Sequence, residues 1–137
     1  MEVFSQEFSV STRKQMEIID VTRGVENAVA SSGIKEGLCI IHTPHATAAI
    51  IVNEGEEGLI YDITKKIEAL FPVAEEYRHN RVDDNAHAHL ASAFLGSSKV
   101  FPIKNSRILR GTWQNILLVE LDGPRTRRVV VTVVGER

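Results

Sequence analysis

The chain has 137 residues and a net charge of −2 at neutral pH; 43% of its residues are hydrophobic and 25% are charged. This length supports one buried core, so we expect a single domain over residues 1–137. The near-neutral charge argues against a nucleic-acid partner. No apolar run approaches the roughly 20 residues of a membrane span and no signal-peptide pattern is present, so we expect a cytoplasmic protein without a membrane partner.

Short apolar runs alternate with turn residues and indicate an α+β protein. We expect about eight strands, at residues 3–10, 15–21, 38–42, 48–52, 99–103, 108–109, 116–121 and 129–134. Three helices are expected, from Asp20 or Thr22 to Gly33, from Glu54 and Glu56 to Phe71, and from Asp84 to Gly96. This order predicts a largely antiparallel sheet system.

Two apolar segments carry further expectations. Residues 129–134 are apolar at nearly every position, so this strand is covered on both faces, by a second sheet, a helix or a neighbouring subunit. The single cysteine, Cys39, lies in another apolar run, which excludes an internal disulfide and predicts a buried structural thiol rather than a nucleophile.

The third expected helix follows a loop rich in His, Asp and Asn. Asp84 is a suitable N-cap, and the helical spacing predicts one buried stripe of Ala86, Leu90, Ala93 and Phe94. His87 and His89 are then separated by about 200° around the helix, so both cannot reach one ion. We expect His89 to be the inward histidine.

The histidines are the main chemical signal. His42 and His45 flank a proline turn, and three more, His79, His87 and His89, fall around Asp83 and Asp84. Imidazole is a common metal ligand, and a three-histidine site leaves a coordination position open for water or substrate. The alternative is a set of surface and capping histidines without a common focus, because no established zinc motif is present.

Other residues are weaker candidates. Glu54 follows a strand, where a general base is often placed, although a helix-start acid is the simpler account. Thr112 and Gln114 flank Trp113 in a turn that can line a pocket, while Trp113 alone reads as a core anchor.

A cluster of arginines follows the last proline turn. Arg125, Arg127 and Arg128 can clamp a phosphate or carboxylate, or can be solvated charges at the start of a strand.

Several motifs in fixed order resemble the YjbQ-like family, small proteins often labelled secondary thiamine-phosphate synthases. The matching segments are His45-Ala46-Thr47-Ala48-Ala49-Ile50, Asn53-Glu54, His79, Asp84-Asn85-x-x-x-His89-Leu90, Leu95-Gly96-Ser97-Ser98, Gly111-Thr112-Trp113-Gln114 and Arg127-Arg128. The resemblance covers nearly the whole chain. Ala46 stands where the family usually has a hydroxyl residue, and Arg110 where it usually has leucine.

The resemblance implies a two-sheet β-sandwich with about three flanking helices, assembled as a homotrimer. It implies a pocket in which His45, His79 and His89 converge and bind a divalent metal ion such as zinc or magnesium. The family label implies the joining of a pyrimidine pyrophosphate to a thiazole phosphate with release of pyrophosphate.

Three hypotheses follow for function. The first is a metal-dependent enzyme acting on a small phosphorylated molecule, most specifically a thiamine-phosphate synthase-like transferase. In it Asp84 and Asn85 orient the histidine ligands, Glu54 acts as acid or base, and Thr112, Gln114, Arg127 and Arg128 bind the phosphorylated partner. The second is a metal-assisted hydrolase with the same ligands. The third is a non-catalytic trimeric module that binds metal or ligand.

Overall fold

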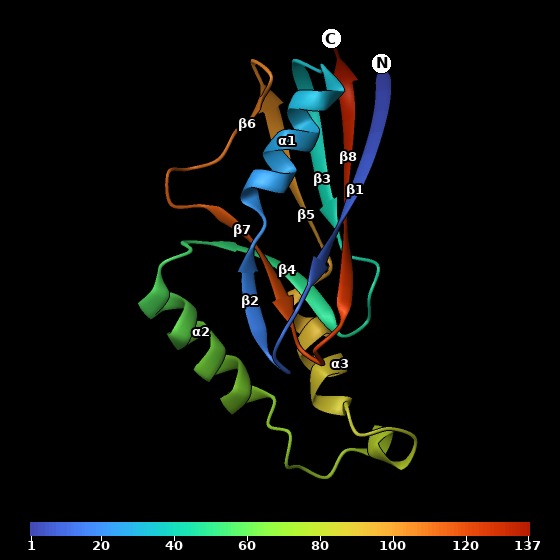
Figure 1. Cartoon of the computed structure of the whole chain (residues 1–137), viewed down its shortest axis with the longest axis vertical. Coiled ribbons are helices and arrows are strands. Elements are labelled where there is room, and N and C mark those ends of the chain that lie inside the picture. Colours follow the sequence, from blue (N-terminus) through green and yellow to red (C-terminus); the bar gives the residue numbers. More distant parts are fainter.

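The computed structural model describes all residues from 1 to 137 and contains two antiparallel sheets (Figure 1). The large sheet has the strand order β1-β8-β3-β5-β6, and the small sheet the order β2-β7-β4. The strands are β1 (Glu2–Ser11), β2 (Glu17–Asp20), β3 (Glu36–His42), β4 (Ala48–Asn53), β5 (Ser98–Lys104), β6 (Arg107–Ile108), β7 (Asn115–Glu120) and β8 (Thr126–Glu136).

Three α-helices and one 3-10 helix complete the chain: α1 (Thr22–Ser32), α2 (Glu57–Leu70), η1 (Arg78–Arg81) and α3 (Ala86–Leu95). The expected α+β architecture of two sheets with three flanking helices is therefore confirmed. None of the helices combines the length and hydrophobicity needed to cross a bilayer.

The elements form layers around two apolar clusters. The larger cluster fills the space between α1, the inner face of the large sheet and one face of the small sheet, and includes Val25, Ile41, Leu118 and Val131. The smaller cluster lies on the other face of the small sheet, where Ile67 of α2 and Ala88 and Ala91 of α3 meet Val119. In Figure 1 α1 crosses the large sheet, whereas α2 and α3 lie around the small one.

The central strand β8 shows how alternate burial along a strand places one face of the large sheet against the core. Val129, Val131 and Val133 point into the core and are fully buried, whereas Val130 and Val134 on the opposite face are only half-buried. Successive side chains of a strand point to opposite faces, so a strand of valines places as many apolar groups outside the core as inside it. Within one chain, β8 is covered on one face only.

Cys39 of β3 lies in the larger cluster. Its side chain is fully buried, and burial raises the pKa of the thiol to about 12. A thiol of this kind is not ionised at neutral pH, so Cys39 is a structural residue, as predicted.

The buried face of α3 differs from the predicted one. Leu90 and Phe94 are 39% and 78% exposed, whereas His87, Ala88 and Ala91 are buried. The predicted stripe was wrong because small side chains allow α3 to approach β4 closely, and Ser92 Oγ donates a hydrogen bond to the Ala48 carbonyl at 2.7 Å. Close backbone approach outweighs the larger apolar area of leucine and phenylalanine at this contact.

The start of α3 also differs from the prediction. Asn85, not Asp84, occupies the N-cap position, and its side chain does not bond the first turn. Asn80 of η1 accepts a hydrogen bond from the Ala86 N–H at 3.3 Å instead. The 3-10 helix is thereby joined to the first turn of α3, which fixes the histidines of the two elements relative to one another.

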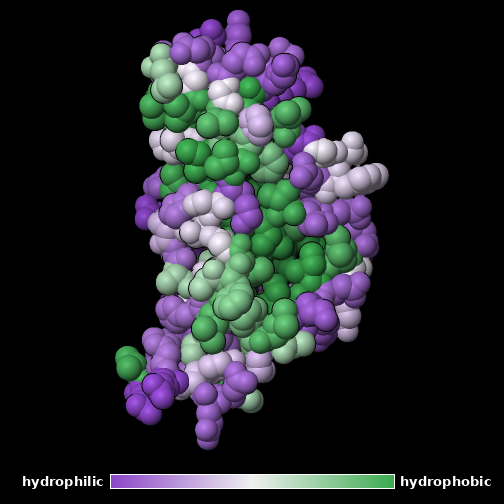
Figure 2. Space-filling view, turned by 180° about the vertical axis from the view of Figure 1, so that it is seen from behind, coloured by the Kyte–Doolittle hydropathy of each residue, from purple (hydrophilic) through white to green (hydrophobic).

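The outer face of the large sheet is apolar. Ile40 lies opposite Val100 on β5 and Thr132 on β8, and Leu38 lies opposite Val134. Figure 2 shows hydrophobic side chains running as a band down this side of the molecule, the side opposite α1. Leu38 and Val100 are exposed, so the chain by itself leaves this patch uncovered.

A buried ion pair joins the two sheets. Glu120 at the end of β7 is fully buried and accepts hydrogen bonds from the guanidinium of Arg127 on β8, one of them from Nε at 2.9 Å. Thr12 Oγ1 donates to the same carboxylate at 2.8 Å, and Arg127 Nη2 donates to the Thr47 carbonyl at 3.0 Å. Every member of this network has a partner, which makes burial of the two charges tolerable.

These hydrogen bonds also determine the ionisation of Glu120. Burial alone would raise the pKa of the carboxyl group, but the hydrogen bonds from Arg127, the Asp122 N–H and Thr12 outweigh it and hold the pKa below its ordinary value of 4.5. The carboxylate therefore stays charged at every pH at which the protein is expected to work.

Replacing Glu120 by glutamine should lower the free energy of unfolding by about 3–5 kcal/mol, because Arg127 would be left as an unpaired buried charge. Urea denaturation at pH 7 measures this loss. The pKa of Glu120 is lower in the folded chain, so its stabilisation is present above about pH 4.5 and is lost as the pH falls through the folded value. The difference in the free energy of unfolding between wild type and Glu120→Gln should therefore become smaller at low pH.

The matched control is Glu7→Gln, which removes an exposed ion pair to Arg128 and should cost less than about 1 kcal/mol. A loss for Glu120→Gln as small as that of the control would contradict the role given to the buried pair.

Candidate functional site

Three elements bring histidines to one end of the small sheet, where β7 ends and β4 begins. His45 lies in the loop between β3 and β4, His79 in η1 and His89 in α3. The rings of His79 and His89 contact each other edge to face, with centroids 4.7 Å apart and planes inclined by 70°. The expectation that His89 is the inward histidine of α3 is wrong, because His87 is buried in the chain and His89 is only half-buried. His89 is instead turned toward His79.

A chain of polar side chains holds His79. Asn85 Nδ2 donates to Asp122 Oδ2 at 2.9 Å, and Asn85 Oδ1 lies 3.2 Å from His79 Nε2. Because the Asp122 carboxylate can only accept, the Asn85 amide group must face it, and the Asn85 oxygen must then accept from the imidazole. His79 therefore carries a proton on Nε2 and leaves Nδ1 free.

Asp122 is itself held in place. Arg125 Nη2 forms an ion pair with Asp122 Oδ2 at 3.0 Å, and the Asp122 N–H donates to the buried Glu120 carboxylate at 3.0 Å. The orientation of His79 thus depends, through Asn85 and Asp122, on the ion pair that joins the sheets.

His89 separates two surface cavities, each of about 390 Å³. The first is lined by Tyr77, Arg78, His79 and Leu90, and the second by His45, Ser92 and Ser97. We call this pair of cavities the histidine cleft. Its walls combine imidazoles, hydroxyls and one guanidinium.

His45 lies at the far wall of the histidine cleft. Its Nε2 accepts a hydrogen bond from the Arg128 backbone N–H at 3.0 Å, so the neutral ring carries its proton on Nδ1. Burial lowers the pKa of His45 below 6.5, and the positive charges of Arg127 and Arg128 lower it further. His45 is therefore a neutral hydrogen-bond donor at pH 7.

Asp83 contributes negative charge beside the two contacting rings. The hydrogen bond from the Asp84 N–H, 2.8 Å long, is the main cause that lowers the pKa of Asp83, and the charges of His79 and His89 lower it further. Asp83 is thus an ionised neighbour of the cleft. Asp84, which the sequence singled out, is exposed.

The arrangement does not fit a three-histidine metal site within one chain. The structure contains no group of three or more His, Cys, Asp or Glu side chains placed to hold a metal ion. His79 has a free Nδ1, but the lone pair of His45 Nε2 is already used by the Arg128 amide. The assignment of a divalent metal to His45, His79 and His89 stays a prediction.

The two arginines predicted to bind an anion have other partners. Arg127 is 3% exposed and its guanidinium engages Glu120 and Thr47, so it is not available to a ligand. Arg128 points to the outer face, where Nη1 pairs with Glu7 at 3.2 Å, and only its backbone N–H faces His45.

Glu54, Thr112 and Gln114 lie at the opposite end of the small sheet. β4 pairs with β7 from Ala48 beside Glu120 to Asn53 beside Asn115, a length of about 17 Å at the usual rise per residue. Glu54 follows Asn53 and Gln114 precedes Asn115, so these residues are remote from the histidine cleft of their own chain. Gln114 Oε1 accepts from the Gly111 N–H at 2.7 Å and shapes the local turn.

Two residues that support the histidine cleft escaped the sequence analysis. Asp122 directly follows the expected strand 116–121 and was not singled out, and Glu120 was included in that apolar strand. A signal for Glu120 was present, because a carboxylate in the otherwise apolar run 116–121 must find a buried partner. No comparable signal marks Asp122, because its contact with Asn85 spans 37 residues.

The fold and the cleft define a class of small α+β proteins with two antiparallel sheets and histidines gathered at one sheet end. The chain belongs to the UPF0047 protein YjbQ-like family, whose model matches residues 6–136. It is 48% identical over 125 residues to a UPF0047 protein of Archaeoglobus fulgidus, covering 91% of this chain and 97% of the relative. It is 36% identical to the UPF0047 protein YugU of Bacillus subtilis, covering 92% and 96%.

Solved structures agree with the fold. A YbjQ-like protein of unknown function from Sulfolobus solfataricus superposes with a TM-score of 0.97 at 49% identity, covering 98% of this chain and 99% of that one. A hypothetical protein from Aeropyrum pernix superposes with a TM-score of 0.93 at 43% identity, covering 99% and 100%.

These comparisons correct the predicted function. The relatives are described as UPF0047 proteins, and the Sulfolobus protein as one of unknown function. The descriptions of the family and of these relatives name neither thiamine-phosphate synthesis nor metal-dependent catalysis. The expectation of a metal-dependent, thiamine-phosphate synthase-like enzyme, which came from the family's label, is wrong, and metal-assisted hydrolysis loses the same support.

The electrostatics of His45 are directly testable. We expect its ring protons to titrate below pH 6.5 in an NMR titration. Arg128→Gln should raise the pKa toward the ordinary value, because it removes a positive charge but keeps the backbone N–H. The rise should be partial, since burial and Arg127 remain.

Arg23→Gln, in α1 and remote from the cleft, is the control and should leave the His45 titration unchanged. A wild-type His45 that titrates above 6.5 would contradict the environment described for it.

Proposed function

We propose that the histidine cleft binds a small phosphorylated molecule through imidazole N–H groups. The observation that supports this proposal is the contact between His79 and His89, with a cavity on each side. His45 carries a proton on Nδ1 and lines one cavity, and Arg78 lines the other, so each cavity has a group suited to phosphate oxygens. Charge-assisted hydrogen bonds of this type are the strong contacts in anion recognition.

The polar chain behind His79 favours a further role for the same site. Asn85 holds the Nε2 proton and leaves Nδ1 able to accept another, which is the arrangement of a histidine general base oriented by an asparagine. We propose that the protein is an enzyme in which His79 moves a proton to or from the bound molecule. This role requires only the residues of the chain.

Binding of inorganic phosphate and pyrophosphate tests the proposal. NMR titration should shift the ring signals of His79 and His89, and His89→Gln should weaken binding about tenfold because one charge-assisted hydrogen bond is lost. His42→Gln is the matched control. His42 bonds Ser98 outside the cleft, so its loss should not change the affinity.

Equal weakening by both variants, or shifts confined to residues outside the cleft, would contradict the proposal. Phosphate binding without turnover of simple phosphate esters would retain the binding role and refute the enzymatic one.

We also propose that the chain forms a homotrimer through the outer face of the large sheet. The apolar band of Figure 2 supports this, since exposed apolar patches of this kind mark interfaces. The strand register gathers Val3, Leu38, Ile40, Val100, Val130 and Val134 on this one face.

Ile40→Lys should dissociate the assembly, because it buries a charge at the centre of this face. Sedimentation velocity should show the mass falling to that of one chain. Ala30→Lys, on exposed α1 at the opposite face, should leave the mass unchanged. A wild-type monomer, or an Ile40→Lys variant of unaltered mass, would refute the interface.

A further inference from the structure

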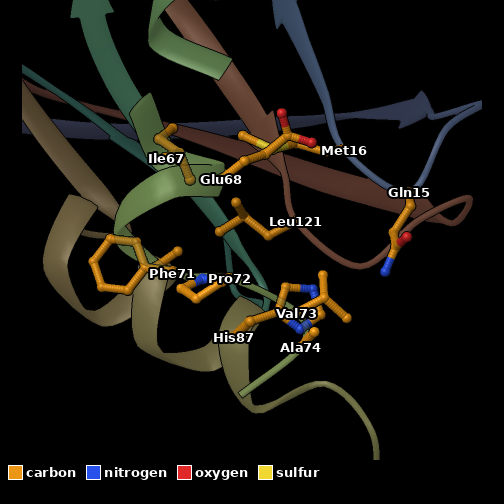
Figure 3. A pocket seen from close by; sticks show the side chains of 11 residues that line it. Gln15, Met16, Ile67, Glu68, Phe71, Pro72, Val73, Ala74, His87 and Leu121 are labelled. Carbon is orange, nitrogen blue, oxygen red and sulfur yellow. The ribbon is translucent and has the colours of Figure 1, made fainter. Parts of the chain in front are cut away.

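A third cavity lies on the other side of α3 from the histidine cleft. It has a volume of about 320 Å³ and is enclosed by the end of α2, the following residues 71–74, α3 and the segment before β2 (Figure 3). Its walls are mainly apolar, formed by Met16, Ile67, Phe71, Pro72, Ala91 and Leu121. An apolar lining offers few hydrogen bonds to water, so it favours an apolar guest.

One buried polar group lines this cavity. His87 is 8% exposed, and its Nδ1 is the one buried side-chain nitrogen or oxygen without a hydrogen-bond partner. Figure 3 shows the His87 ring on the cavity side of α3, among Pro72, Val73 and Ala74. Native proteins pair nearly all buried polar atoms. Nδ1 has almost no accessible surface, whereas the other ring nitrogen, Nε2, is also unbonded within the chain but is not buried, so Nε2 is the nitrogen that a guest in the cavity can reach.

The chemistry of the wall restricts the guest. A buried N–H without an acceptor is rarer than a buried lone pair without a donor, so the neutral ring is best placed with its lone pair on Nδ1. The proton is then on the accessible Nε2, and the partner is an acceptor. No lysine or arginine lines the cavity, and Glu68 at its edge carries negative charge, so an anionic guest is disfavoured.

We propose that this cavity binds a compact, uncharged aromatic molecule with one hydroxyl group, and that the hydroxyl oxygen accepts a hydrogen bond from His87 Nε2–H. The volume is at the lower end of the range for ligand pockets, which suits a single substituted ring. Phe71 and Met16 supply the ring and sulfur contacts that aromatic guests prefer.

The site is independent of the proposed phosphate-binding role. His87 and His89 are separated by about 200° around α3, so the two ligands would approach opposite sides of the helix. Failure of one proposal therefore leaves the other standing.

The test compares 4-ethylphenol with ethylbenzene by isothermal titration calorimetry on the full chain. The two probes differ only in the hydroxyl, so wild type should bind 4-ethylphenol about tenfold more tightly. His87→Leu replaces the imidazole by an apolar side chain of similar length and should abolish the difference in affinity between the two probes. Equal affinity of wild type for both probes, no binding of either, or an unchanged difference in His87→Leu would overturn the proposal.

Two further variants make the result specific to this cavity. Ala74→Phe adds a ring at an exposed position of the wall and should weaken the binding of both probes. This variant still tests the site if His87→Leu does not fold. His89→Gln alters the histidine cleft and should leave both affinities unchanged. Loss of binding in His89→Gln, or full binding in Ala74→Phe, would place the probes elsewhere and refute the assignment.

Discussion

The buried pair of Glu120 and Arg127 is the interaction on which the remaining structure depends. It is made by the last residue of β7 and an inward residue of β8, so it sets how the two sheets meet. The pair also fixes the turn between these strands, because Glu120 accepts from the Asp122 N–H. Removal of either charge would leave the other buried without a partner, which is why both must be present together.

The geometry of the histidine cleft depends on this pair. Asp122 orients Asn85, Asn85 orients His79, and the adjacent strand β8 presents the Arg128 amide to His45. A structural ion pair thus supports the hydrogen-bonding state of two histidines that do not touch it. Arg127, which the sequence suggested as a ligand for anions, therefore affects the cleft indirectly. It holds Glu120 in place, and its positive charge lowers the pKa of His45.

Helix α3 separates two chemically different environments. His89 faces a polar cleft, and His87 faces an apolar cavity, although only one residue lies between them. The small residues Ala88, Ala91 and Ser92 make this possible, because they let the helix lie close to β4. The bulkier Leu90 and Phe94 are left at the surface.

The sequence by itself determined the α+β class, the succession of strands and helices, the buried thiol of Cys39 and the histidines worth examining. These follow from local periodicity and turn chemistry, which are properties of neighbouring residues. Only the tertiary structure decided that α3 buries its alanine face, that Arg127 pairs with Glu120, and that Glu54, Thr112 and Gln114 lie far from the histidine cleft. Each of these depends on contacts between segments distant in the chain, and on the close approach of backbones, which the spacing of residues along the sequence does not encode.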